Sequence, residues 1–424
     1  MAQSVTSAAS TPVWGWMCDK GGMSHRMLWT MGTLGWGVVM LALAASWNIA
    51  MILCLRFVNG FFLACLAPLT TAWVADHIPP AKSGFIFGLI FSSATAGGLA
   101  STGSAVMLQD RMFHVPGAGS VSGWRLLCVC IGLLAFASSL VTWLFLDVKH
   151  AAESNKAVGR LSIVTSVTAA FRGMVESVRV HWRSHTFRVI SVQGIGGGMA
   201  ANAMSFDIMF LQYLGMTPGQ LVLLGSVAAL PSLVSSTTGG MFGDFMERKR
   251  PNHGRAFTAQ ICVAGIMLAI MLQYVILPSA IGPVVAPYAI AKCLLPMFGS
   301  MYHPGVLRPL LIEVADPDRR ALIIAWQHAL EGICAGAVGG PLVGLLSEHA
   351  FGYKAYSGDF ASMPPELHTH NLSALRKAVA TMTLVPLSIC FCLNSCLHQA
   401  YPRDKRMWAE ERKRSDTKGE YSGE

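Results

Sequence analysis

Long apolar stretches, separated by short polar or basic segments, run through almost the whole chain. A helix needs about 20 apolar residues to cross the hydrocarbon core of a bilayer. Ten runs of this kind lie near residues 27–46, 49–75, 83–107, 125–146, 187–213, 218–243, 256–277, 283–312, 321–347 and 376–397. The pattern predicts an all-α, multi-pass membrane helix bundle with about ten transmembrane helices.

The polar segments between the runs predict the domain organisation. We expect a cytoplasmic N-terminal segment over 1–26, a four-helix bundle over 27–146, a basic cytoplasmic linker over 147–186, a six-helix bundle over 187–398 and a basic cytoplasmic tail over 399–424. Most of the 31 Lys and Arg residues then fall on one side, as expected of cytoplasmic loops, so the C-terminus is predicted to be cytoplasmic. The linker either lies on the membrane as an amphipathic helix or is a solvated connection.

Composition supports a membrane protein and argues against several other classes. Charged residues make up 12% of the chain, about half of the usual share of roughly 25% in a soluble domain. The net charge of +9 is spread between apolar runs, so it does not indicate a nucleic-acid partner. Most of the 11 Cys residues lie inside apolar runs, where they indicate neither disulfides nor a metal site. Because no catalytic or nucleotide-binding motif stands in a suitable context, we expect no enzyme activity and no cofactor.

A Gly-xxx-Asp pair followed by basic residues occurs twice, with six apolar runs between the copies. An acid beside cations at a helix end can form a charge network that breaks and re-forms as two bundles rock. The repetition therefore indicates an internal repeat and a conformational gate. The candidate gate residues are Gly15, Asp19, Gly22, Arg26, Asp76, Gly240, Asp244 and Arg248.

The two copies resemble the signature loop of the major facilitator superfamily, which joins the second and third helices of each six-helix half. The resemblance implies a major facilitator fold of twelve helices, of which this chain is expected to lack the first two. The segment from Arg56 to Gly60, and that from Asp76 to Gly84, resemble the fourth helix and following loop of its spinster-like branch of sphingolipid and lysolipid transporters. The segment from Trp326 to Gly332 resembles the same branch.

Ionisable groups inside membrane runs are costly and are therefore candidates for a solute or proton pathway. Arg56 either faces a cavity, as the resemblance implies, or extends to the near membrane surface. Asp207 follows Asn202 in the fifth run, where it is either a proton or head-group ligand or a hydrogen-bonded acid near the interface. Tyr302 and His303 are expected to line a core or cavity rather than to bind metal.

Lys292 and Glu331 lie at similar predicted depths in consecutive runs, which predicts an ion pair between them. His328 stands one turn before Glu331, so the group is either a proton relay or a static buried salt bridge. A stripe of glycines at four-residue spacing in the same run predicts a helix-packing face, and consists of Gly332, Gly336, Gly340 and Gly344.

The sequence is compatible with three hypotheses about function. The first is a monomeric secondary active transporter that moves a small organic or lipid-like solute by alternating access, with or without proton coupling, and that contacts membrane lipids. The second is a non-transporting receptor or scaffold with the same fold. The third is a truncated gene model of a twelve-helix transporter, which is compatible with the first.

Overall fold

The computed structural model describes residues 2–20, 23–108, 111–115, 119–146, 175–176, 178–277, 285–315, 319–356 and 363–421. Within them, eight helices are long and apolar enough to cross a membrane, namely His25–Ala44, Ile49–His77, Pro80–Ala105, Gly123–Phe145, Gly219–Lys249, Gly254–Ile276, Arg320–Ala350 and Pro365–Glu410. The other two predicted runs, 187–213 and 283–312, are also helical but are interrupted. The all-α prediction is confirmed, apart from one short hairpin. Gly22 and most of the predicted linker lie outside the described residues.

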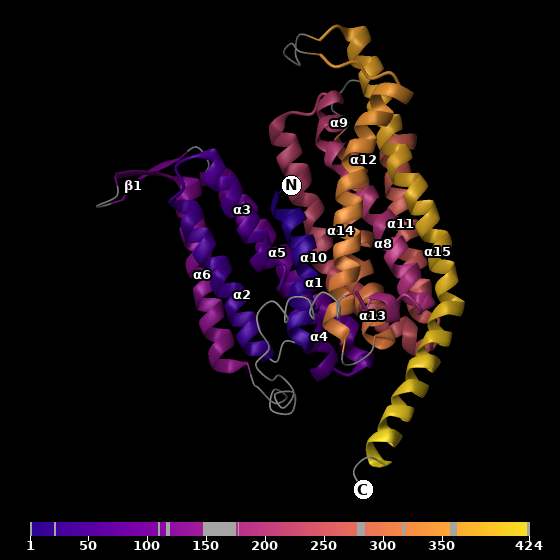
Figure 1. The fold of residues 1–424 in the computed structure, drawn as a ribbon. Helices are drawn as coiled ribbons and strands as arrows, with labels where there is room; N and C mark the ends of the chain where they lie inside the picture. The colour runs from indigo at the N-terminus through magenta and orange to yellow at the C-terminus, as the bar shows by residue number, and fades with distance from the viewer. Residues whose placement is uncertain are drawn as a thin grey trace.

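The N-terminal helices form one group, drawn in indigo and purple in Figure 1. Its elements are α1 (Ala2–Lys20), α2 (His25–Ala44), α3 (Ile49–Leu63), α4 (Leu66–His77), the 3-10 turn η1 (Pro80–Lys82), α5 (Ser83–Leu108) and α6 (Gly123–Phe145). Between α5 and α6 the sequence did not predict the antiparallel hairpin of β1 (Met112–Val115) and β2 (Gly119–Ser122), in which Met112 is opposite Ser122.

Helix α1 lies where the sequence predicted a cytoplasmic segment. It packs along α3, α4 and α14, so it belongs to the bundle and contacts both helix groups. Its polar residues Thr6, Ser10 and Thr11 are buried. The hydroxyl of Thr11 donates a hydrogen bond to the carbonyl of Ser7 in the same helix. Small and hydroxyl residues are typical of helix contacts inside membranes and have low hydropathy, which explains why hydropathy missed α1.

The C-terminal group holds the larger buried core. Its elements are α8 (His185–Ala203), η3 (Met204–Phe206), α9 (Asp207–Tyr213), α10 (Pro218–Lys249), α11 (Gly254–Met271), η4 (Leu272–Ile276), α12 (Val285–Tyr302), η5 (His303–Leu307), α13 (Arg308–Val314), α14 (Arg320–Leu345), η7 (Leu346–Ala350) and α15 (Pro365–Tyr421). The turn η3 interrupts the run 187–213. The π-helical turn η5 interrupts the run 283–312 at Pro304, which has no backbone N–H to donate.

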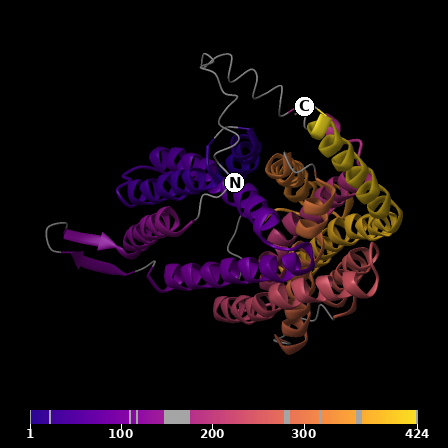
Figure 2. The ribbon, with the colours of Figure 1, turned by 90° about the horizontal axis from the view of Figure 1, so that it is seen from below.

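The two groups meet along two helix pairs. Helix α1 packs on α14, and α5 packs on α10. Figure 2 shows the second pair as two long helices lying side by side. Each pair has one helix from each group. Each pair also contains one Gly-xxx-Asp segment, on α1 in the first pair and on α10 in the second.

Candidate functional site

Each aspartate of the repeated motif caps a helix of the opposite group. Asp19, at the end of α1, accepts hydrogen bonds from the backbone N–H groups of Ala321 (3.2 Å) and Leu322 (2.8 Å) at the start of α14. Asp244, near the end of α10, accepts from those of Gly84 (3.2 Å) and Phe85 (3.0 Å) at the start of α5. A carboxylate at a helix N-terminus satisfies free N–H groups and favours the positive end of the helix dipole. We call this end of the bundle the motif end.

The motif glycines allow the close helix approach that these caps require. A Cβ atom on Gly15 would lie 2.7 Å from the Cβ of Ala325 on α14. A Cβ atom on Gly240 would lie 2.0 Å from the carbonyl oxygen of Gly84 on α5. Both distances are too short for any side chain, so a larger residue at either position must push the two groups apart.

The basic partner of Asp244 is Arg255, which the sequence analysis did not include among the gate residues. The buried Arg255 guanidinium lies 3.1 Å from Asp244 and donates to the carbonyl of Gly305 at 3.0 Å. Its Nε lies 3.7 Å from Glu313, which also pairs with Lys405 at 2.7 Å. The proposed Arg248 is exposed instead.

The other two proposed gate residues lie in different surroundings. Asp76 forms a 3.5 Å ion pair with Arg320 at the start of α14, so it does bridge the two groups. Arg26 stacks over the ring of Trp143 on α6, 4.2 Å from its centroid. Arg26 therefore contacts its own group, while Asp76 joins Asp19 and Asp244 at the interface.

The opposite end of the bundle, which we call the far end, is open between the groups. Apart from the backbone of the same helix, no described atom would lie within 4 Å of a Cβ built on the glycines of the far halves of α5, α10 and α14, namely Gly97, Gly98, Gly103, Gly225, Gly336, Gly340 and Gly344. The predicted glycine packing face is therefore wrong for three of its four members in this conformation. Only Gly332 is close to another helix, with its Cβ position 2.9 Å from Ala8 on α1.

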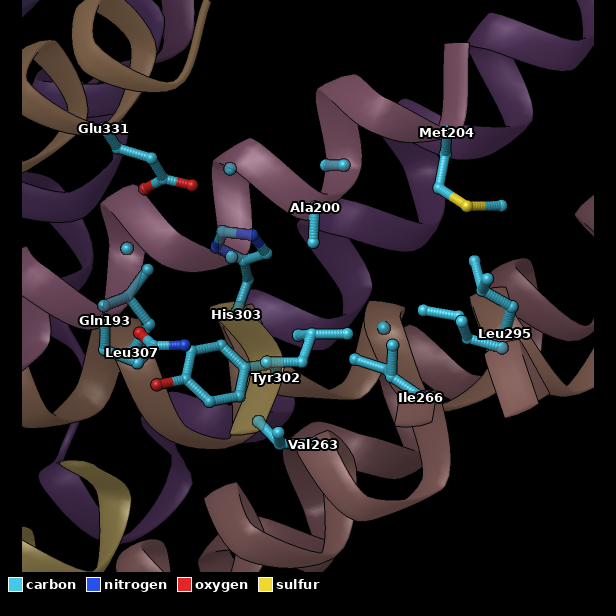
Figure 3. A pocket seen from close by; sticks show the side chains of 17 residues that line it. Gln193, Ala200, Met204, Val263, Ile266, Leu295, Tyr302, His303, Leu307 and Glu331 are labelled. Carbon is cyan, nitrogen blue, oxygen red and sulfur yellow. The ribbon is translucent and has the colours of Figure 1, made fainter. Parts of the chain in front are cut away.

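A cavity of about 210 Å³ lies among α8, α11, α12 and α14. That volume holds several waters or a small organic molecule. Figure 3 shows its polar side chains, Gln193, Tyr302, His303 and Glu331, gathered at one end, with Met204, Ile266 and Leu295 at the other. The expectation that Tyr302 and His303 line a cavity is confirmed.

Glu331 reaches the cavity because α8 offers glycines opposite it. A Cβ on Gly194 would lie 3.4 Å from the Glu331 carboxylate, and one on Gly198 would lie 3.4 Å from its Cγ. The carboxylate accepts a hydrogen bond from Gln327 at 2.7 Å. His328 and Arg308 are within electrostatic range of it. Glu331 is therefore an acid held at a cavity wall by a polar cluster.

Several buried polar atoms in this cluster lack a hydrogen-bond partner among the described residues. They are Gln193 Oε1, His303 Nδ1, Arg308 Nη1 and Gln327 Oε1. Buried polar groups in folded proteins are nearly always hydrogen-bonded, and exceptions often mark a site for water or a ligand. Gln193, Arg308 and Gln327 were not among the residues predicted from the sequence, although an arginine inside an apolar run was a usable signal for Arg308.

The predicted Lys292–Glu331 ion pair is wrong. Lys292, in α12, pairs with the buried Asp207 of α9. Asp207 also accepts hydrogen bonds from Gln273 and from the hydroxyl of Tyr274 at 2.5 Å. Lys292 lies near the start of α12 at the far end, at the level of α9. The predicted depth of Lys292 in the membrane was therefore insufficient to decide whether it pairs with Asp207 or with Glu331.

Arg56 and Asn202 do not line the cavity. The exposed Arg56 donates a hydrogen bond to the side chain of Gln3 on α1 at 3.1 Å. Gly60, one turn later on α3, packs against the same residue, because a Cβ built on it would lie 2.3 Å from the carbonyl oxygen of Gln3. Asn202 is exposed and donates to the carbonyl of Gly198 in its own helix at 2.9 Å. Of the predicted pathway residues, only Glu331 is a cavity-lining residue, with His328 beside it.

The comparisons with known proteins agree with this geometry. The chain is 23% identical over 355 residues to the multidrug resistance protein MdtG of Serratia proteamaculans, covering 82% of this chain and 76% of that protein. Its fold matches the human organic anion transporter MFSD10 with a TM-score of 0.65 and 14% identity, over 93% of this chain and 82% of that one. A bacterial homologue of the human lysosomal transporter Spinster matches with a TM-score of 0.51 and 14% identity, over 95% and 94%.

The family model described as Major Facilitator Superfamily matches residues 1–339, which include both Gly-xxx-Asp segments, helices α1, α5 and α10, and all but the last residues of α14. The chain belongs to the Major Facilitator Superfamily.

Proposed function

We propose that this chain is a secondary active transporter that moves a small amphipathic organic or lipid-like solute by alternating access. The observation that carries the proposal is the pair of crossing caps, Asp19 on α14 and Asp244 on α5, which close the motif end while the far end stays open. Two rigid groups that are capped at one end and separated at the other are arranged as alternating access requires.

Membership of the family makes the chain a multi-pass membrane protein and a transporter. The cavity favours a molecule with an apolar body and a polar group, because its two ends differ in polarity. The curated relative is named for multidrug resistance, which fits such a molecule. A spinster-like lipid solute stays a prediction from the sequence motifs, as does the monomeric state.

Glu331 is our candidate for proton coupling. Its carboxylate lines the cavity and accepts a hydrogen bond from Gln327, so it is within reach of a bound solute. A proton on Glu331 would remove that charge, change its hydrogen bond with Gln327 and alter binding of a charged solute. We place the motif end and the C-terminus in the cytoplasm, which makes the described conformation open to the outside.

The proposal is tested with the full chain in proteoliposomes carrying an imposed pH gradient. Uptake of a panel of lipophilic cations, organic anions and lysolipids would be measured for the wild type, Glu331→Gln and the matched control Glu366→Gln. Glu366 is exposed and belongs to the start of α15, away from the cavity.

We expect Glu331→Gln to insert and fold but to lose the dependence of transport on the pH gradient, while Glu366→Gln behaves like the wild type. An unchanged pH profile for Glu331→Gln would show that this carboxyl does not couple transport. Absence of uptake for every solute in the folded wild type would favour the receptor or scaffold reading instead.

A further inference from the structure

A second cavity, which is a groove open to solvent with a volume of about 510 Å³, lies at the motif end of the C-terminal group. All of its lining residues come from α15, except His253, which immediately precedes α11. It is therefore separate from the solute cavity and from the interface between the groups. Its ionisable and amide lining consists of His253, His398, Gln399, Arg403, Arg406 and Glu410.

The two histidines of this cavity face each other. Their Nδ1 atoms are 3.2 Å apart. The ring of Phe257 packs edge-on against His398, with centroids 4.5 Å apart, and Gln260 lies 3.4 Å from the His398 Nε2. Side chains of α11 thus hold the imidazole of α15 in place, so this wall of the cavity is a built structure rather than a loose surface group.

The arginines of the cavity have no ion-pair partner among the described residues. Arg403 and Arg406 are one helical turn apart and exposed. The guanidinium of Arg250 lies 4.9 Å above the ring of Phe257, so a third arginine is next to the cavity. The single acid, Glu410, balances only part of this charge. Guanidinium groups bind phosphate through paired hydrogen bonds, which makes a phosphate group the matching anion.

The cavity also lies where a membrane-spanning surface begins. The candidate span of α11 starts at Gly254, directly after His253. On α11, Ile261 and Leu268 are eight and fifteen residues after His253 and are 40% and 56% exposed, which places them on the same helix face. On α15, Phe391 is seven residues before His398 and 37% exposed. An apolar surface therefore continues from the basic cavity toward the membrane centre.

We propose that this cavity binds the phosphate of an anionic phospholipid, whose acyl chains lie along the exposed apolar faces of α11 and α15. The basic side chains supply the anion site, and the adjoining apolar surface selects a lipid over a free phosphate. Basic pockets between membrane helices are a known type of head-group site. This lipid is bound from the leaflet at the motif end and is distinct from the transported solute.

Native mass spectrometry of the full chain tests the proposal, with phosphatidylglycerol, phosphatidylcholine and soluble glycerol 3-phosphate as probes. We expect the wild type to prefer phosphatidylglycerol over phosphatidylcholine. The Arg403→Gln/Arg406→Gln variant should bind phosphatidylglycerol about 30-fold more weakly, as two charges near a membrane surface predict. Arg179→Gln/Arg183→Gln, which removes two exposed charges outside the cavity, should bind it like the wild type.

The charge-retaining variant Arg403→Lys/Arg406→Lys provides a second test that does not depend on the glutamine variant folding well. It should keep a preference for phosphatidylglycerol. Equal binding of both lipids by the wild type, or loss of the preference in the control variant alone, would overturn the site. Competition by glycerol 3-phosphate at the same concentration as the lipid would identify a free-phosphate site and would overturn the lipid assignment.

Discussion

The two ends of the interface between the helix groups use charge in different ways. At the motif end, Asp19, Asp244 and Asp76 each bind a partner in the opposite group. At the far end, Lys292 pairs with Asp207 inside the C-terminal group. Arg376 on α15 likewise donates to backbone carbonyls at the end of the neighbouring helix within that group, including those of Val275 and Leu277.

This difference explains which end can separate at low cost. Separation at the motif end breaks two helix caps and one ion pair, and exposes the interface glycines that fit closely there. Separation at the far end leaves every one of these charged contacts intact. The glycines of the far end face open space, and their small size suits a second conformation in which that end closes and the motif end opens.

The largest expected effect is on the stability of the far end. Replacing Lys292 by Met leaves Asp207 buried without its cation, which should lower the free energy of unfolding by about 3–5 kcal/mol. The double variant Asp207→Asn/Lys292→Met should recover much of this loss. Denaturant unfolding in detergent measures both. If the double variant were as unstable as the single one, the pair would not be the reason for the loss.

A smaller effect is expected from the caps at the motif end. Replacing both Asp19 and Asp244 by Ala removes two helix caps, each worth about 0.5–2 kcal/mol. The conformational equilibrium should shift toward the state that is open at the motif end, and the free energy of unfolding should also fall because the buried Arg255 loses its Asp244 partner. Spin labels at Ala81 in η1 and Phe245 in α10, which line the same pocket at that end, report the shift as a longer distance. An unchanged distance distribution would mean that the caps do not hold the end closed.

The smallest and most specific effect is expected from paired glycine substitutions. Gly240→Ala places a Cβ 2.0 Å from the Gly84 carbonyl and should open the motif end. Gly340→Ala meets no described atom within 4 Å, so it should leave this conformation unchanged and instead hinder closure of the far end. The same spin-label pair distinguishes them. Similar motif-end distances for Gly240→Ala and Gly340→Ala would show that close packing at Gly240 is not what keeps the motif end closed.

Hydropathy predicted most of the helices because lipid-facing surfaces must be apolar. It missed α1, where Thr6 and Thr11 are buried between other helices and need no lipid-facing surface. It also predicted single runs where η3 and η5 interrupt the helices, because such turns change hydrogen bonding without changing composition.

The candidate site was predicted in part, because a sequence motif gives side chains and their helix positions but not how the helix groups pack. The Gly-xxx-Asp repeat located Asp19 and Asp244 because each acts through its own side chain at a fixed helix end. The repeat could not show that each aspartate caps the opposite group, since that depends on how the groups pack. For the same reason Lys292 was paired with the wrong acid, and Arg255 was overlooked as the partner of Asp244.

The most direct test of the account measures both ends of the interface in one protein. One spin-label pair at Ala81 and Phe245 reports the motif end, and a second at Thr102 on α5 and Ser226 on α10 reports the far end. We expect Asp19→Ala/Asp244→Ala to lengthen the first distance and shorten the second, because the groups rock as rigid bodies. A longer motif-end distance with an unchanged far-end distance would contradict it.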